Sequence, residues 1–123
     1  ALASQAQDEE SESQAGAGLL ARFQAMVESD YRTARSVGSY ATALGVTPTH
    51  LSRVCRGLTG SSASRLILER RLLEARRALA YTSMQVAEIA YMLGYSDPAY
   101  FARVFAKATG ESPSAFRARM TGL

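Results

Sequence analysis

The sequence predicts an all-α fold in which two helix-turn-helix subdomains are joined by a long connecting helix. Three observations support this prediction. Apolar residues recur at helical spacing along most of the chain after residue 18. No glycine or proline occurs between residues 61 and 93, which disfavours a fold rich in strands and turns. A pattern of helix, glycine and helix occurs twice, with an offset of 49 to 50 residues.

Residues 1–18 differ in composition from the rest of the chain. They carry four acidic and no basic residues, a charge of −4, whereas residues 19–123 carry +7, which together give the net charge of +3. Because this stretch has almost no apolar bulk to bury, we expect a flexible acidic linker that follows a separate N-terminal domain. The basic part is rich in arginine, whose planar fork suits phosphates and guanine edges.

The first helix is expected from Leu19 to about Tyr31. Its expected buried stripe is Leu19, Phe23, Met26, Val27 and Tyr31.

The first helix-turn-helix is expected over residues 36–60. Ser36 is a suitable N-cap for a short helix that ends at Gly45, and Thr47 with Pro48 begins the next helix. The side chains expected to face the core are Tyr40, Ala41 and Leu44 in the first helix and Leu51, Val54, Cys55 and Leu58 in the second.

The connecting helix is expected over residues 62–81. Its apolar face is Leu66, Leu72, Leu73, Ala75 and Leu79, and its basic face is Arg70, Arg71, Arg76 and Arg77. Glu74 and Arg77 are three residues apart, so we expect them to form an ion pair on the helix surface.

The second helix-turn-helix is expected over residues 85–110. Gly94 is placed to end its first helix, and Ser96 to cap the second, with Pro98 in the first turn. The expected apolar stripe of that second helix is Phe101, Val104, Phe105 and Ala108. Gly110 ends it, a further helix begins at Ser112 with Pro113, and residues 120–123 form a tail.

The two helix-turn-helix stretches are copies of one unit. Ala41, Leu44 and Gly45 match Ala90, Leu93 and Gly94 at an offset of 49 residues; Pro48, Arg53, Val54, Thr59, Gly60 and Ser62 match Pro98, Arg103, Val104, Thr109, Gly110 and Ser112 at an offset of 50 residues. One residue is therefore inserted in the second turn, near Asp97. Core and cap positions repeat, whereas the exposed pairs Thr49/Ala99 and Ser52/Ala102 differ.

The second helix of such a unit can enter the major groove of DNA, so its exposed face holds the candidate contacts. The candidate base contacts are Thr49, Ser52, Arg53, Ala99, Tyr100 and Arg103. The candidate phosphate contacts are Thr47, Arg56, Ser96, Lys107 and Arg117. Two alternatives stay open at this point: Thr47 and Ser96 could act only as helix caps, and the charged side chains could simply face water.

The sequence offers no chemistry of another kind. We find no cluster of metal ligands, no glycine-rich phosphate loop and no pair of nucleophile and base, so we predict no catalytic residue, no metal and no cofactor. No apolar run is long enough to cross a membrane, and a single cysteine, Cys55, fits a reducing cytoplasm. We expect the buried Cys55 thiol to be inert.

The arginine-rich connecting helix and the block LGYSDPAYFARVFAKATGESPSAFR resemble the DNA-binding domain of the AraC/XylS family of transcription regulators. The resemblance covers residues 19–119. It implies a domain of about seven helices, with two recognition helices in adjacent major-groove segments of double-stranded DNA. It matches Arg53 and Arg103 to positions that reach into the groove. The sequence departs from the family at Gln85, a poor N-cap, and at Thr49 and Ala99.

The resemblance further implies a cytoplasmic, nucleoid-associated regulator or activator of transcription that contacts RNA polymerase. It implies that a domain absent from this chain binds an effector and dimerises. Two other hypotheses remain: a DNA-binding appendage of a multidomain enzyme, such as an alkylation-repair regulator, and a helical bundle that binds only proteins.

Overall fold

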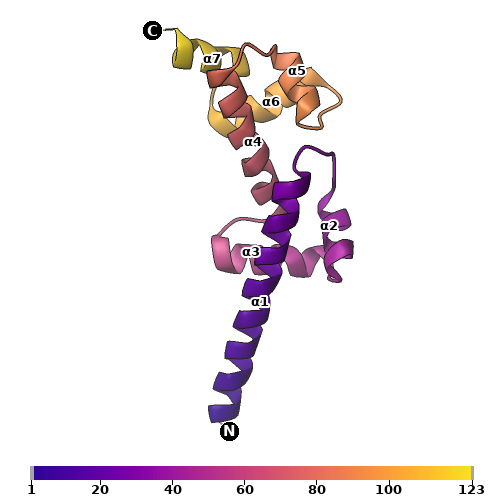
Figure 1. Cartoon of the computed structure of the whole chain (residues 1–123). Coiled ribbons are helices and arrows are strands. Elements are labelled where there is room, and N and C mark those ends of the chain that lie inside the picture. The colour runs from indigo at the N-terminus through magenta and orange to yellow at the C-terminus, as the bar shows by residue number, and fades with distance from the viewer. Residues whose placement is uncertain (1, 123) are drawn as a thin grey trace. The chain divides into compact units, whose positions relative to one another are not determined.

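The computed structural model describes residues 2–122, and their side chains from residue 4 onward. Within this range the chain forms seven helices and no strand, which confirms the predicted all-α class (Figure 1). The helices are α1 (Leu2–Asp30), α2 (Val37–Leu44), α3 (Pro48–Thr59), α4 (Ala63–Tyr81), α5 (Val86–Met92), α6 (Pro98–Thr109) and α7 (Pro113–Thr121).

The chain divides into two compact units. Unit 1 comprises the residues up to Ser29 together with Arg35–Ile67, and it contains most of α1, all of α2 and α3, and the start of α4. Unit 2 comprises Asp30–Ala34 and the residues from Leu68 onward, with the rest of α4 and helices α5 to α7.

Helix α1 begins at Leu2, and this differs from the predicted start at Leu19. Residues 4–15 are exposed, as their polar composition predicts, but they are helical nevertheless. A helix that packing has already nucleated, here by Leu19 and Phe23, extends at low cost through alanine, glutamine and glutamate, which are good helix formers. The stretch expected to be a flexible acidic linker is therefore helical over the residues that the structure describes, and its role as a linker stays a prediction.

Unit 1 is held together by a core from α1, α2 and α3. Phe23 of α1 meets Tyr40 of α2 edge-on, with ring centroids 5.4 Å apart, and both side chains are fully buried. Leu51 and Cys55 of α3 are also fully buried, as predicted. Leu58 was predicted to face the core, but 49% of it is exposed.

Unit 2 contains a row of aromatic rings that joins its helices. Tyr95 contacts Phe101, Phe101 contacts Phe105, and Phe105 contacts Phe116, with ring centroids 5.2, 6.0 and 5.7 Å apart. These contacts tie the turn before α6 and both helices α6 and α7 into one core.

Helix α4 confirms only part of its predicted apolar face. Leu72, Ala75 and Leu79 are buried, whereas 40% of Leu73 is exposed. Ile67, which the prediction left out, is buried instead. Glu74 pairs with Arg77, as predicted, at 3.7 Å and also with Arg70 at 3.3 Å.

Three helices begin at the capping residue that the sequence predicts. Ser36, Thr47 and Ser112 each accept a hydrogen bond from the amide three residues later, at 3.0–3.1 Å. Ser96 was expected to cap α6, but Asp97 is the N-cap, and its Oδ1 accepts from the amide of Ala99 at 2.9 Å. A carboxylate is a strong N-cap because it also meets the positive end of the helix dipole.

Candidate nucleic-acid interface

Helix α3 presents a polar face on the side opposite its buried residues. Its Thr47 cap fixes where the helix begins, and the buried Leu51 and Cys55 fix its rotation about its own axis. The four candidate residues of this face are Thr49, Ser52, Arg53 and Arg56, of which all but the half-buried Ser52 are exposed. Their spacing of three, one and three residues places them on one side of the helix, where a flat ligand surface could meet them together.

Helix α6 presents the matching face in unit 2. Phe101 and Phe105 point into the core, which leaves Ala99, Tyr100 and Arg103 on the exposed side. The Arg103 guanidinium carbon lies 5.8 Å from the centroid of the Tyr100 ring, a cation–π contact. The Tyr100 ring in turn lies 6.2 Å from that of Tyr95. Tyr100 therefore supports Arg103 from a position that is itself braced by the aromatic row.

Two of the predicted phosphate contacts have exposed side chains at the ends of α3 and α6. Arg56 and Lys107 are exposed and lie in the last turns of α3 and α6. Thr47 is exposed, and its hydroxyl is the acceptor that caps α3. Ser96 is exposed and stands one residue before the capping Asp97, whose carboxylate would disfavour an anion close by.

Arg117 has partners that the sequence did not indicate. Its Nε donates to the carbonyl oxygen of Leu79 at 3.0 Å, and one terminal nitrogen donates to the carbonyl oxygens of Thr82 at 3.3 Å and Ala78 at 3.5 Å. Leu79 lies in the last turn of α4 and Thr82 directly follows it, where carbonyls lack helical amide partners, whereas the Ala78 carbonyl also accepts from the amide of Thr82 at 3.1 Å. The guanidinium therefore anchors α7 to the end of α4.

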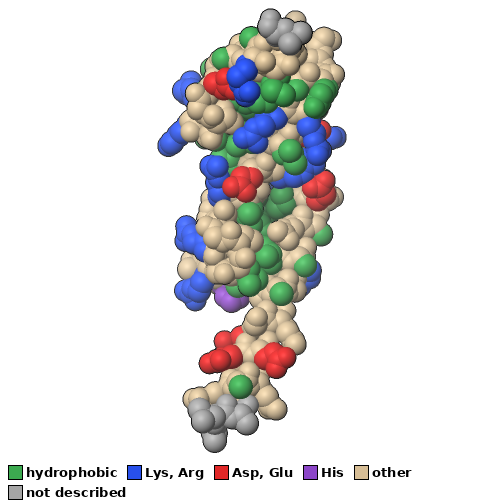
Figure 2. Space-filling model, turned by 90° about the vertical axis from the view of Figure 1, so that its left-hand side faces the viewer, with side chains coloured by type: hydrophobic (Ala, Val, Ile, Leu, Met, Phe, Trp, Pro, Cys, Tyr) green, Lys and Arg blue, Asp and Glu red, His purple; other side chains and the backbone are tan. Residues whose placement is uncertain are grey.

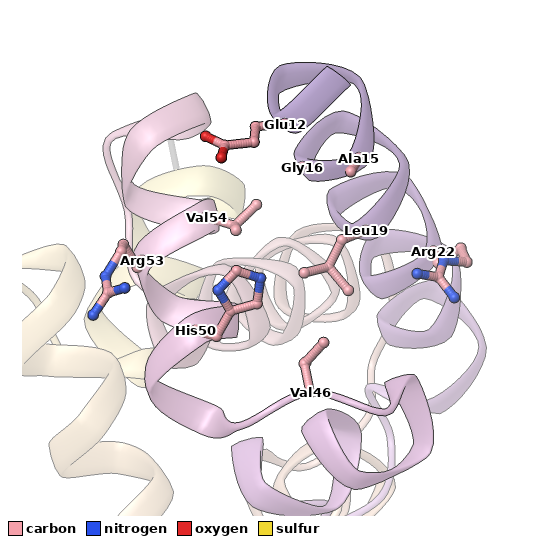
Figure 3. A pocket seen from close by; sticks show the side chains of 9 residues that line it. All are labelled: Glu12, Ala15, Gly16, Leu19, Arg22, Val46, His50, Arg53 and Val54. Atoms are coloured by element: carbon pink, nitrogen blue, oxygen red, sulfur yellow. The ribbon is translucent and has the colours of Figure 1, made fainter. Parts of the chain in front are cut away.

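A groove beside α3 was also missed. Its volume is about 610 Å³, and it lies within unit 1 between α1 and the flank of α3 (Figure 3). Its lining residues are Glu12, Ala15, Gly16, Leu19, Arg22, Val46, His50, Arg53 and Val54. The sequence could not indicate that Glu12 and Arg53 line one groove, because residues 1–18 were expected to be a flexible linker.

No other chemistry gathers in the described part of the chain. Among these residues no group of three or more His, Cys, Asp or Glu side chains could hold a metal ion. Cys55 is fully buried, and that burial raises the pKa of its thiol, which disfavours the reactive thiolate. None of the helices described is both long and apolar enough to span a bilayer.

Known proteins with the same pattern are regulators of transcription. A family model described as a helix-turn-helix domain matches residues 40–119. The arabinose operon regulatory protein of Escherichia coli (strain K12) is 37% identical over 82 residues, which cover 67% of this chain and 28% of that protein. The transcriptional activator AarP of Providencia stuartii is 31% identical over 104 residues, which cover 85% of this chain and 77% of AarP.

Solved structures show the same arrangement of helices. The C-terminal domain of AraT, a response regulator from Geobacillus stearothermophilus, matches with a TM-score of 0.78 and 29% identity, covering 82% of this chain and 84% of that one. The DNA-binding domain of AdpA, a global transcriptional factor solved with a target DNA, matches with a TM-score of 0.70 and 26% identity, covering 85% and 90%. The chain spans less than a third of the arabinose regulator's length.

Proposed function

Because the chain belongs to the AraC-type helix-turn-helix family of transcription regulators, we propose that it binds double-stranded DNA through α3 and α6. The observation that carries this proposal is the repeated pair of faces. Each unit holds one helix whose core side is fixed by buried residues and whose opposite side exposes an arginine, Arg53 or Arg103. The major groove of B-DNA is wide enough to admit one such helix.

The exposed residues of the two helices then divide into two roles. Thr49, Ser52 and Arg53 of α3 contact base edges in one groove segment, and Ala99, Tyr100 and Arg103 of α6 do so in the next. An arginine that donates two hydrogen bonds to guanine is the commonest specific contact of this kind. Ala99 carries only a methyl group and would contact the methyl group of a thymine.

The second role is to hold the phosphate backbone. Arg56 and Lys107 are the candidates with exposed cationic side chains, and Thr47 lies at the start of α3, where polar groups often approach phosphates. Ser96 is the weakest candidate, because the Asp97 carboxylate next to it disfavours a phosphate. For Arg117 we propose a positioning role in place of the phosphate contact expected from the sequence, because its guanidinium already donates to the end of α4.

The full protein is proposed to regulate transcription in the cytoplasm. Its relatives carry the names of regulators and activators, which favours this over the appendage of an enzyme. Because the chain spans less than a third of the arabinose regulator, a separate domain for an effector or for dimerisation is part of the proposal, as is a contact with RNA polymerase.

Selection of bound duplexes from a random pool tests the proposal. The faces of α3 and α6 differ at Thr49 against Ala99 and at the half-buried Ser52 against Ala102, so they should enrich an asymmetric site with two parts about 10 base pairs apart. A pool without enrichment contradicts sequence-specific binding. A palindromic site contradicts the division of reading between α3 and α6.

A further inference from the structure

The two units differ in the balance of their charges. Unit 1 carries five arginines and five acidic residues, whereas unit 2 carries nine basic and six acidic residues. Four of the five acidic residues of unit 1 are Asp8, Glu9, Glu10 and Glu12. One short stretch of α1 therefore neutralises most of the positive charge of the unit that contains α3.

These four residues are part of an ordered helix that passes beside α3. Figure 1 shows that α1 crosses α3 and that its own N-terminal end extends beyond α3. In Figure 2, acidic side chains near this end of α1 are visible on the same face of the molecule as the single histidine, His50. The two helices approach closely at Gly16, where an added Cβ would lie 3.6 Å from Val54 Cγ1. This contact places Glu12, one turn before Gly16, beside α3, and the helix then extends beyond α3 (Figure 1).

Of the four acidic residues, Glu12 is the one that lines a groove together with Arg53. It lines the same groove as His50 and Arg53, and Figure 3 shows its side chain extending from α1 toward α3. A second groove, of about 400 Å³, is lined by Glu9 and Glu12 from α1 and by Val54, Gly57 and Leu58 from α3. Carboxylates therefore border the flank of α3 along two successive turns.

We propose that the acidic first half of α1 acts as an electrostatic brake on DNA binding by α3. The brake rests on the proposed DNA binding and adds a regulated property to it. DNA that approaches Arg53 brings a dense row of phosphates, one negative charge per about 1.7 Å of helix axis, toward these carboxylates. Their repulsion acts over a Debye length of about 10 Å at 0.1 M salt, a range that fits neighbouring helices.

As a consequence, α3 and α6 differ in how strongly they bind the phosphates of DNA. Helix α6 lies in the unit whose basic residues outnumber its acidic ones, so it engages phosphates without this opposition. When the carboxylates in the first half of α1 are neutralised or moved away, α3 binds DNA more tightly, and binding by α6 is unchanged. Binding of α3 to its half of the DNA site therefore depends on any molecule that contacts the acidic first half of α1.

The test replaces the four carboxylates by their amides in the whole chain: Asp8→Asn, Glu9→Gln, Glu10→Gln and Glu12→Gln. These side chains are exposed, so the helix should persist, and circular dichroism checks this. Affinity is measured by fluorescence anisotropy with a labelled duplex of about 25 base pairs, long enough for two successive groove segments. We expect the variant to bind about three- to tenfold tighter at about 0.05 M KCl, and the gap to fall below about twofold at about 0.3 M.

A matched pair of single variants separates a local effect from net charge. Glu12→Gln removes a carboxylate beside α3, and Glu88→Gln removes an exposed one from α5 in unit 2. Glu12→Gln should tighten binding more, and its gain should shrink when Arg53→Ala is also present, because coupled neighbours are not additive. An equal gain from both single variants overturns the local brake.

The failure of the brake is distinguishable from the failure of DNA binding. If the native chain and the neutralised variant bind equally at every salt concentration, the brake is overturned and DNA binding stands. If neither protein binds duplex DNA at about 0.05 M KCl, a concentration that favours phosphate contacts, the proposed function itself is overturned.

Discussion

Arg71 Nε donates a hydrogen bond to the carbonyl oxygen of Tyr31 at 2.9 Å, across 40 residues of sequence. One terminal nitrogen of the same guanidinium donates to the carbonyl oxygen of Thr33 at 2.8 Å. Both acceptors follow the last turn of α1, where carbonyls lack helical partners. Arg71 therefore fixes the segment 30–34 within unit 2, although α1 belongs almost entirely to unit 1.

Replacing Arg71 by alanine should lower the free energy of unfolding by about 2–3 kcal/mol, because hydrogen bonds to a charged donor contribute more than neutral ones. Urea denaturation measures the change. Arg77→Ala is the matched control on the same helix, since 58% of the Arg77 side chain is exposed. That control should cost below about 0.5 kcal/mol. Equal costs for the two variants would show that the Tyr31 and Thr33 contacts contribute nothing.

Gly45 and Gly94 occupy equivalent positions in the two turns but differ in their surroundings. Both have positive φ, 73° and 88°, so alanine is strained at each. A Cβ on Gly94 would lie 2.7 Å from the carbonyl oxygen of Arg32, a backbone atom, whereas nothing lies within 4 Å of one on Gly45.

We therefore expect Gly45→Ala to cost about 1–2 kcal/mol and Gly94→Ala about 3 kcal/mol or more, because the second change adds overpacking to the backbone strain. Thermal unfolding of the two variants gives the comparison. If Gly94→Ala were no worse than Gly45→Ala, the close packing of the 30–34 segment against this turn would be refuted.

The repeat made most of the fold predictable. Helix starts at Ser36, Thr47 and Ser112 depend on local capping, and the buried Tyr40, Leu51 and Phe105 follow from helical spacing. Such signals lie within a few residues of one another, so sequence alone is sufficient to detect them.

Features that depend on distant residues were not predictable. The donation from Arg117 to the end of α4 and the exposure of Leu58 follow from how whole helices pack, and sequence spacing carries no such information. The cap at Asp97 was missed because Ser96 and Asp97 are both good caps and the inserted residue left the turn ambiguous. The candidate base contacts stay predictions.

Substitution of Arg117 should change the stability of the fold, whereas substitution of Lys107 should change only the affinity for DNA. Arg117→Ala should lower the free energy of unfolding by about 1.5–3 kcal/mol, because it leaves helix-end carbonyls without a charged donor. Lys107→Ala should leave stability within about 0.5 kcal/mol and reduce the salt dependence of binding by about one phosphate contact. Denaturation and salt-titrated binding check the pair. The assignment fails if Arg117→Ala changes the salt dependence and leaves stability intact.

Arg53 and Arg103 should each govern one base pair in different halves of the site. Alanine at either position should cost about 1–3 kcal/mol of discrimination at that base pair and leave the other half unaffected. Arg56→Ala is the control, because loss of a phosphate contact weakens binding evenly across sequences. Binding to a set of singly substituted duplexes measures the pattern. Uniform weakening by Arg53→Ala or Arg103→Ala would contradict base reading.

The salt dependence of the affinity of the native chain for a duplex tests DNA binding by α3 and α6 most directly. If α3 and α6 both engage the backbone, the logarithm of the association constant should fall with the logarithm of the salt concentration with a slope of about −4 or steeper. A selected duplex should bind more tightly than a scrambled one throughout. Absence of binding at about 0.05 M salt, or a slope flatter than about −1, would contradict DNA binding through α3 and α6.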